Sequence, residues 1–259
     1  MDRIKVEQII ADFLDRKGPL DTLDDSEATF YENFSLLPIN SFAAGKNEHF
    51  QHTGTATLIA PTFQASPAGG GISITTQTGS PASGDESRLW PLAQSAWSMN
   101  IKPVATGQRT IFDYNVRVGA SIAATGIRAG LKLTDTAVIA TDADQALFVF
   151  DTSDTANFGP AGVGTFTASA NWVCMVSIAG DDVAFDTGVP VAANTDYWLN
   201  IRLNASGQAE FRINDSLKYT SGVLTATAAL LPAPLQVVTR TTAAKVHGIR
   251  DCRKTRTYV

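Results

Sequence analysis

The sequence is poor in charge and in the residues that build metal or redox centres. Charged residues occupy 17% of its 259 positions, and it holds two cysteines and three histidines. These few thiols and imidazoles lack the clustered spacing of a structural zinc site, so no metal or other cofactor is expected. The net charge of -5 also argues against general nucleic-acid binding, because lysine and arginine supply most of that affinity.

Long apolar segments are missing as well. No run of about 18 apolar residues occurs, and the charged N-terminus (Met1 to Lys5) is not followed by the apolar core of a signal peptide. We therefore expect a protein that is synthesised in the cytoplasm and does not span a membrane. In that compartment Cys174 and Cys252 are expected to stay reduced, with a disulfide between them as the less favoured alternative.

What the sequence does contain is a series of short segments in which apolar and polar residues alternate. The clearest lies in residues 194–222, where 199–203 and 209–213 each show the period of two that is typical of a strand with one buried face. Turn residues separate these strands at 204–207 and 214–216. The stretch predicts a three-stranded antiparallel meander.

Similar segments recur along the chain, separated by Gly, Pro, Asn and Asp, and no helices alternate with them. This pattern predicts an all-β protein built as an antiparallel β-sandwich. The further strands are expected at residues 55–63, 71–77, 88–101, 110–118, 127–133, 145–151, 171–179, 235–239 and 246–259.

The meander carries a family resemblance. Its order Tyr-Trp-Leu-x-Ile-x-Leu, a Ser-Gly turn and Glu-Phe-x-Ile-Asn-Asp resembles the central hairpin of concanavalin A-like and laminin G-like jelly rolls, although Asn214-Asp215 stands where those proteins usually have Asp-Gly. The chain is most similar to tailed-bacteriophage virion proteins that carry this sandwich. The resemblance implies a non-enzymatic structural component of a phage virion, attached to the particle as a capsid decoration or accessory protein.

An amphipathic helix is expected before the sandwich. Apolar residues recur at helical spacing between Arg3 and Arg16, and Gly18-Pro19 ends the pattern. We expect residues 1–44 to form this helix and an extended arm, and residues 45–259 to form the jelly roll. The helix would dock on other virion proteins or on a second copy in a homo-oligomer, or alternatively cover its own sheet. Its docking residues would be Ile4, Val6, Ile9, Ile10, Phe13 and Leu14.

The alternative function is a carbohydrate-binding module that recognises a host surface glycan from a tail fibre or tail tip. Aspartates and asparagines in the loops near residues 142–145 and 157–164 are suitable for hydrogen bonds to sugars. Calcium is a further option there, although turn formation explains each aspartate. The four tryptophans are expected to pack in the core or at a sheet edge, with a sugar-stacking platform as the less favoured alternative. The candidate glycan residues are Asp142, Asp144, Asn157 and Trp172.

Catalytic motifs are not found in the sequence. A Gly-x-Ser-x-Gly elbow and the Glu-x-Asp-x-x-Glu motif of glycoside hydrolases on this fold are both missing. His49 and His52 are expected to be a pair in a surface loop, and His247 has no nucleophile motif to serve. We therefore expect no enzymatic activity.

Overall fold

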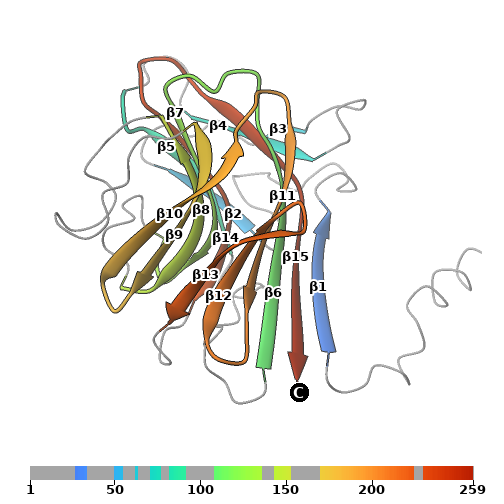
Figure 1. The fold of residues 1–259 in the computed structure, drawn as a ribbon. Coiled ribbons are helices and arrows are strands. Elements are labelled where there is room, and N and C mark those ends of the chain that lie inside the picture. Colours follow the sequence, from blue (N-terminus) through green and yellow to red (C-terminus); the bar gives the residue numbers. More distant parts are fainter. Residues whose placement is uncertain are drawn as a thin grey trace, which may run out of the picture.

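Two antiparallel sheets pack face to face as a sandwich in the computed structural model of the chain (Figure 1). The structure describes residues 27–33, 50–54, 62–63, 71–76, 82–91, 108–135, 143–152, 170–224 and 230–258. The regular secondary structure in these residues is β-strand, so the predicted all-β antiparallel sandwich is confirmed. The predicted helix and its six docking residues lie outside the described part of the chain.

Fifteen strands are described. In chain order they are β1 (Glu27–Asn33), β2 (Phe50–Gly54), β3 (Thr62–Phe63), β4 (Ile72–Thr75), β5 (Glu86–Pro91), β6 (Gln108–Arg117), β7 (Thr125–Lys132), β8 (Gln145–Asp151), β9 (Asn171–Ile178), β10 (Asp181–Pro190), β11 (Asp196–Leu203), β12 (Gln208–Ile213), β13 (Ser216–Val223), β14 (Leu231–Thr239) and β15 (Val246–Tyr258).

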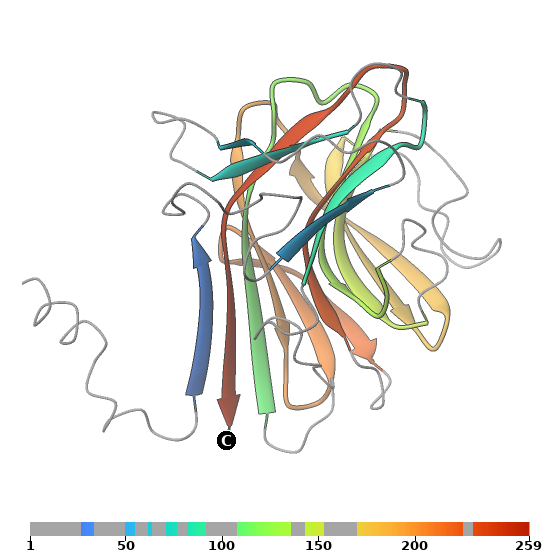
Figure 2. The same ribbon diagram turned by 180° about the vertical axis from the view of Figure 1, so that it is seen from behind.

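The strands divide into two sheets, which we call sheet A and sheet B. Sheet A has the order β13-β12-β11-β6-β15-β4-β3, and β1 pairs with the remaining length of β15. Sheet B has the order β10-β9-β8-β7-β14-β5-β2 (Figure 2). Neighbours in these lists are often distant in sequence, so the chain crosses repeatedly between sheets and the fold depends on long-range pairing.

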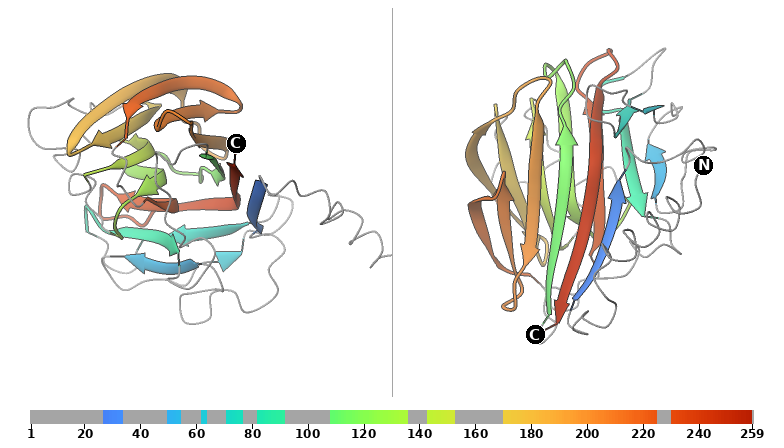
Figure 3. Two further views of the ribbon diagram at one scale, coloured as in Figure 1. Left: turned by 90° about the horizontal axis from the view of Figure 1, so that it is seen from below. Right: turned by 90° about the vertical axis from the view of Figure 1, so that its right-hand side faces the viewer.

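Part of the predicted arm belongs to sheet A. All seven residues of β1 pair antiparallel with β15, from Glu27 opposite Thr257 to Asn33 opposite Asp251. Figure 3 shows β1 running beside the long strand β15. Deleting residues 1–40 would therefore remove a strand of the sheet and leave the backbone of residues 251–257 unpaired on that side.

The central hairpin confirms the predicted meander and its two turns. Gly207 adopts a φ of 76° in the turn between β11 and β12, a conformation that glycine reaches without steric cost. Between β12 and β13, Asn214 and Asp215 have φ values of 48° and 64°. Two positive φ values in a two-residue loop are typical of a type I′ hairpin turn, so Asn-Asp replaces Asp-Gly here without changing the connection.

Aromatic side chains fill the space between the sheets. Phe148 of sheet B meets Phe211 of sheet A edge to face, with ring centroids 5.2 Å apart. Cys174 and Cys252 are both buried and are thiols not joined in a disulfide, in agreement with the favoured expectation. Burial raises the pKa of the Cys174 thiol well above its ordinary value, so this cysteine is an inert core residue.

Both described histidines are buried. His52 is 5% exposed in β2 and its Nε2 lies within hydrogen-bond distance of Ser87 Oγ, so the prediction of a surface-loop position is wrong for this residue. His247 accepts a hydrogen bond from the backbone N–H of Gly119 (3.0 Å) at Nδ1, and its Nε2 lies 3.1 Å from Thr125 Oγ1. His49 lies outside the described residues.

These histidines predict a loss of stability in mild acid. Burial, and to a lesser degree the charge of Lys245, lowers the pKa of His247 to about 3, and burial lowers the pKa of His52 to about 4. The unfolded chain takes up protons below about pH 6.5 and the folded chain does not, so stability is full above that pH and falls below it. Each histidine removes up to about 1.4 kcal/mol per pH unit.

Urea unfolding at a series of pH values between 7 and 5 checks this expectation. His247→Gln should lose stability at pH 7 but show about half the dependence on pH, because His52 still titrates on unfolding. An unchanged dependence on pH in this variant would contradict the assignment of His247 as a neutral core residue.

Candidate functional site

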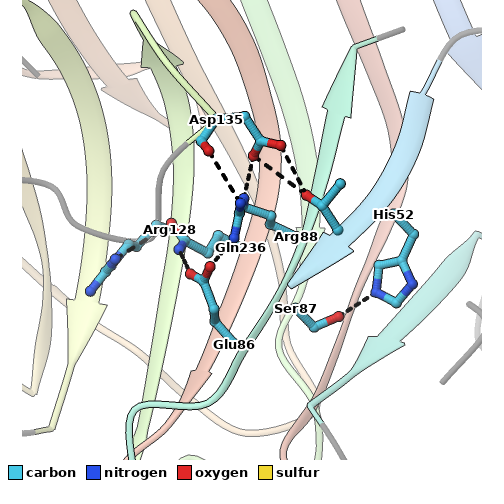
Figure 4. A network of polar contacts seen from close by, with 8 residues as sticks. His52, Glu86, Ser87, Arg88, Arg128, Asp135 and Gln236 are labelled. Carbon is cyan, nitrogen blue, oxygen red and sulfur yellow. Dashed lines mark hydrogen bonds and ion pairs between the residues drawn. The ribbon is translucent and has the colours of Figure 1, made fainter. Parts of the chain in front are cut away.

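A network of polar side chains crosses the outer face of sheet B (Figure 4). Arg88 of β5 contacts the carboxylate of Asp135, and its Nη2 donates to the Asp135 carbonyl (3.2 Å). The same guanidinium pairs with Glu86, which also accepts a hydrogen bond from Gln236 of β14. Arg128 of β7 donates to Gln236 (3.4 Å). The network thus joins three adjacent strands and the residues that follow β7.

A second buried ion cluster continues this network. Asp151, with no exposed side-chain surface, accepts hydrogen bonds from Nε (3.0 Å and 3.2 Å) and Nη2 (2.5 Å) of Arg240 and lies 3.9 Å from Arg128. Burial lowers the pKa of Arg128 to about 10, so its guanidinium remains charged at neutral pH. These charges are buried and paired with one another, and we therefore interpret the cluster as a structural brace rather than a ligand surface.

The outer face of sheet A has a different character, because a large aromatic side chain is exposed there. In β11 the side chains of Tyr197, Leu199 and Ile201 point into the core, and the alternation of a strand directs Trp198 and Asn200 outward. Trp198 is 46% exposed, somewhat more than Phe185 of β10 at 41%. Its indole is therefore available to a ligand.

Polar side chains lie beside this indole along a line that crosses the sheet, on β6, on β15 and in the turn between β12 and β13. Trp198 lies opposite Asn115 of β6, which in turn lies opposite Asp251 of β15. The Asn115 amide donates to Asp251 Oδ2 (3.3 Å), and on the other side Asn214 Oδ1 accepts from the backbone N–H of Trp198 (3.0 Å). Trp198 thus stands in a row of hydrogen-bonding groups that runs across the sheet.

Ion pairs flank this row on both sides. On one side Asp196 binds both Arg117 (3.0 Å) and Arg250 (2.7 Å). On the other side Asp113 binds Arg253 (2.7 Å) and accepts a hydrogen bond from Asn200. We call these residues and the row between them the polar band. Its members are Asp113, Asn115, Arg117, Asp196, Asn200, Asp251 and Arg253, with Arg250 at its end.

Three acceptor oxygens of the polar band lack a hydrogen-bond partner. They are Oδ1 of Asn115, Asp196 and Asp251, and each is shielded from solvent by neighbouring side chains. Burial raises the pKa of Asp251, which is the expected effect of removing a carboxylate from water. Each of these oxygens has the capacity to accept one further hydrogen bond from an N–H or O–H donor.

A depression opens on the same face of sheet A, at the turn between β11 and β12. Its volume is about 400 Å³, within the range of small-molecule sites. It begins four residues from Trp198 along β11, roughly 13 Å at the rise of a strand. Arg202, Asn204 and Glu210 supply its polar groups. The remaining lining residues are Ile111, Leu203, Ala205 and Ser206.

The glycan residues predicted from the sequence do not form this site. Asp142 and Asn157 lie outside the described residues. Asp144 is buried, with its Oδ1 3.5 Å from the backbone N of Ala179. Trp172 has no exposed surface, because it packs edge to face against Phe150 and Tyr197 in the core, so its assignment as a glycan contact is wrong.

Two further features bear on binding. Among the residues that the structure describes, no three His, Cys, Asp or Glu side chains are grouped in a way that could hold a metal ion. A search of the same residues for a helix long and apolar enough to cross a membrane also finds none.

Comparisons with known proteins identify the fold. No protein-family model and no curated protein matches the sequence. Among solved structures, the chain is similar to SO2946, a protein of unknown function from Shewanella oneidensis MR-1, with a TM-score of 0.59, 8% identity and coverage of 96% of this chain and 94% of the other.

Two lectin domains are also similar to the chain. Winged bean acidic lectin complexed with methyl-α-D-galactose gives a TM-score of 0.52 at 13% identity, with 90% of this chain and 100% of the lectin covered. The metal-free carbohydrate recognition domain of Emp46p gives 0.53 at 6% identity, covering 86% and 94%. The chain has the concanavalin A-like jelly-roll fold. At such low identity the likeness concerns the fold alone.

Proposed function

We propose that the protein is a non-catalytic carbohydrate-binding module whose glycan contacts the outer face of sheet A. The exposed indole of Trp198 within the polar band is the observation that carries this proposal. The apolar face of a sugar ring packs against an aromatic ring, while neighbouring amide and charged groups bind its hydroxyls. Arg202, Asn204 and Glu210 of the depression would contact a more distant sugar of the same glycan along β11.

The fold supports this proposal without specifying the site. The similar domains of winged bean lectin and Emp46p are named for carbohydrate binding or recognition. Fold alone does not transfer a ligand, since one fold hosts many functions. Trp198 therefore carries the proposal, because its indole is 46% exposed and lies beside the hydrogen-bonding groups of the polar band.

A panel of immobilised glycans tests the proposal with the full chain. We expect saturable binding to at least one glycan, and this binding should persist when EDTA removes divalent cations, because the described residues include no group of His, Cys, Asp or Glu side chains that could hold a metal ion. Absence of binding to every glycan, with and without added calcium, would refute the proposed function.

We also propose, from the sequence resemblance alone, that the module is carried on a bacteriophage particle after synthesis in the host cytoplasm. Glycan binding would then serve recognition of the host surface, and other virion proteins would hold the module in place. Mass spectrometry of purified particles should detect the chain. Its presence in infected lysate but not in particles would contradict this location.

A further inference from the structure

Both sheets end at the same side of the sandwich in an unpaired edge strand. β13 pairs with β12 and β10 pairs with β9, and within the described part of the chain no strand covers the outer edge of either. The two edges lie close together, since Phe185 of β10 stacks on Tyr219 of β13 with ring centroids 4.9 Å apart. Unpaired backbone groups along such edges are a template for pairing with another strand.

The side chains of β13 are symmetric about its centre. Leu217, Thr220 and Val223 lie opposite Arg212, Glu210 and Gln208 of β12, which places all three on the outer face of sheet A. Leu217 is 48% exposed and Val223 is 54% exposed. Each is three residues from Thr220, so two exposed apolar side chains flank a central threonine.

This symmetry matches the requirement for pairing with an identical strand. We propose that two copies of the chain associate through antiparallel pairing of β13 with β13, about a two-fold axis at Thr220. In this register Leu217 of each copy packs against Val223 of the partner subunit, and the two copies of Thr220 face each other on the axis. The single charged side chain of β13, Lys218, lies opposite Gly222 of the partner subunit, so no like charges are opposed.

β10 is less suited to the same role. It contains three aspartates, so pairing two copies along β10 would gather six carboxylates at one interface. Pairing along β13 brings only the two Lys218 ammonium groups to the interface, and the register does not place them opposite each other. It also joins sheet A of both copies into one continuous sheet, with the two Trp198 side chains on the same face.

Sedimentation velocity over a dilution series of the full chain tests this dimer. We expect a dimer for the natural sequence and a monomer for Thr220→Lys, because the variant places two lysines directly opposite each other on the axis. Val183→Lys introduces the same charge at a 40% exposed position of β10 and should stay dimeric. A natural chain that is monomeric at its highest soluble concentration, or a Thr220→Lys variant that remains dimeric, would overturn the proposal.

Cysteine cross-linking tests the register separately. Opposed residues of an antiparallel pair have Cα atoms about 4.5–5.5 Å apart, which a disulfide can span. We expect oxidation to cross-link a mixture of Leu217→Cys and Val223→Cys chains, and Thr220→Cys with itself, while Leu217→Cys alone stays uncross-linked. The natural cysteines are buried and do not compete. Cross-linking of Leu217→Cys with itself, or none in the mixture, would contradict the register.

Discussion

Replacing Trp198 with alanine is expected to weaken glycan binding by at least about tenfold. Loss of an aromatic surface that a sugar covers removes about 1.5–3 kcal/mol of burial energy, and 1.4 kcal/mol corresponds to a tenfold change in affinity. The variant should fold normally, because Trp198 projects from the outer face of sheet A and is 46% exposed. Isothermal titration with the best-binding glycan of the panel gives the affinity.

Two further variants make this result specific. Trp198→Phe keeps an aromatic face and should retain most of the affinity. Val246→Ala removes a side chain that is 44% exposed in β15, in the part of that strand paired with β4, and should bind like the natural chain. Unchanged binding by Trp198→Ala would show that the glycan lies elsewhere.

Asp151→Ala is expected to be the most destabilising change considered, with a loss of about 3–5 kcal/mol of unfolding free energy. Asp151 has no exposed side-chain surface and contacts Arg240 and Arg128, whose side chains are 4% and 2% exposed. Removing the carboxylate leaves two buried guanidinium groups without their counter-charge. Because domain stability is often only 5–15 kcal/mol, the variant should unfold at much lower urea concentration.

Asp196→Ala is the matched control for this prediction. Asp196 also contacts two arginines, Arg117 and Arg250, but both arginine side chains are 22% exposed, Asp196 is 29% exposed, and water screens the charges. The expected loss is about 1 kcal/mol or less. Equal losses in the two variants would contradict the role of the sheet B cluster as a buried brace.

Dimerisation through β13 would raise the apparent affinity for a multivalent glycan surface. Two Trp198 sites on one continuous sheet convert the second contact into an intramolecular one, which can add a factor of about 10² or more when the spacing of the glycans fits. Thr220→Lys should therefore bind a dense glycan surface more weakly while keeping the affinity of the natural chain for a free monosaccharide or oligosaccharide.

The sequence was sufficient to predict the sandwich because strand alternation is a local signal. Residues 199–203 and 209–213 show it without interruption, and the turn residues between them fix the hairpin register. β1 was not predicted, since its assignment depends on pairing with residues 251–257 more than 200 positions away. Backbone pairing over such a distance leaves no periodic trace in the strand itself.

The tryptophans show both the strength and the limit of the sequence analysis. Trp172 was proposed as a glycan contact because aromatic faces stack on sugars, but it is the first large core residue of β9. Trp198 was assigned to packing in the core or at a sheet edge, although its position in the alternation groups it with Asn200 and Arg202 on the outer face. The alternation of inward and outward side chains along β11 was therefore the sequence signal that places Trp198 on the outer face. The depression at Arg202 and Glu210 required the three-dimensional arrangement of β6, β11 and β12.

Titration of the isotope-labelled protein with the best-binding glycan, followed by two-dimensional NMR, tests the central claim most directly. We predict that the indole N–H of Trp198 and the backbone amides of Asn200 and Arg202 shift with increasing glycan. The indole of Trp172 should stay unchanged, because it is buried in the core. Shifts confined to sheet B or to residues 143–145, with none at Trp198, would contradict glycan binding on the outer face of sheet A.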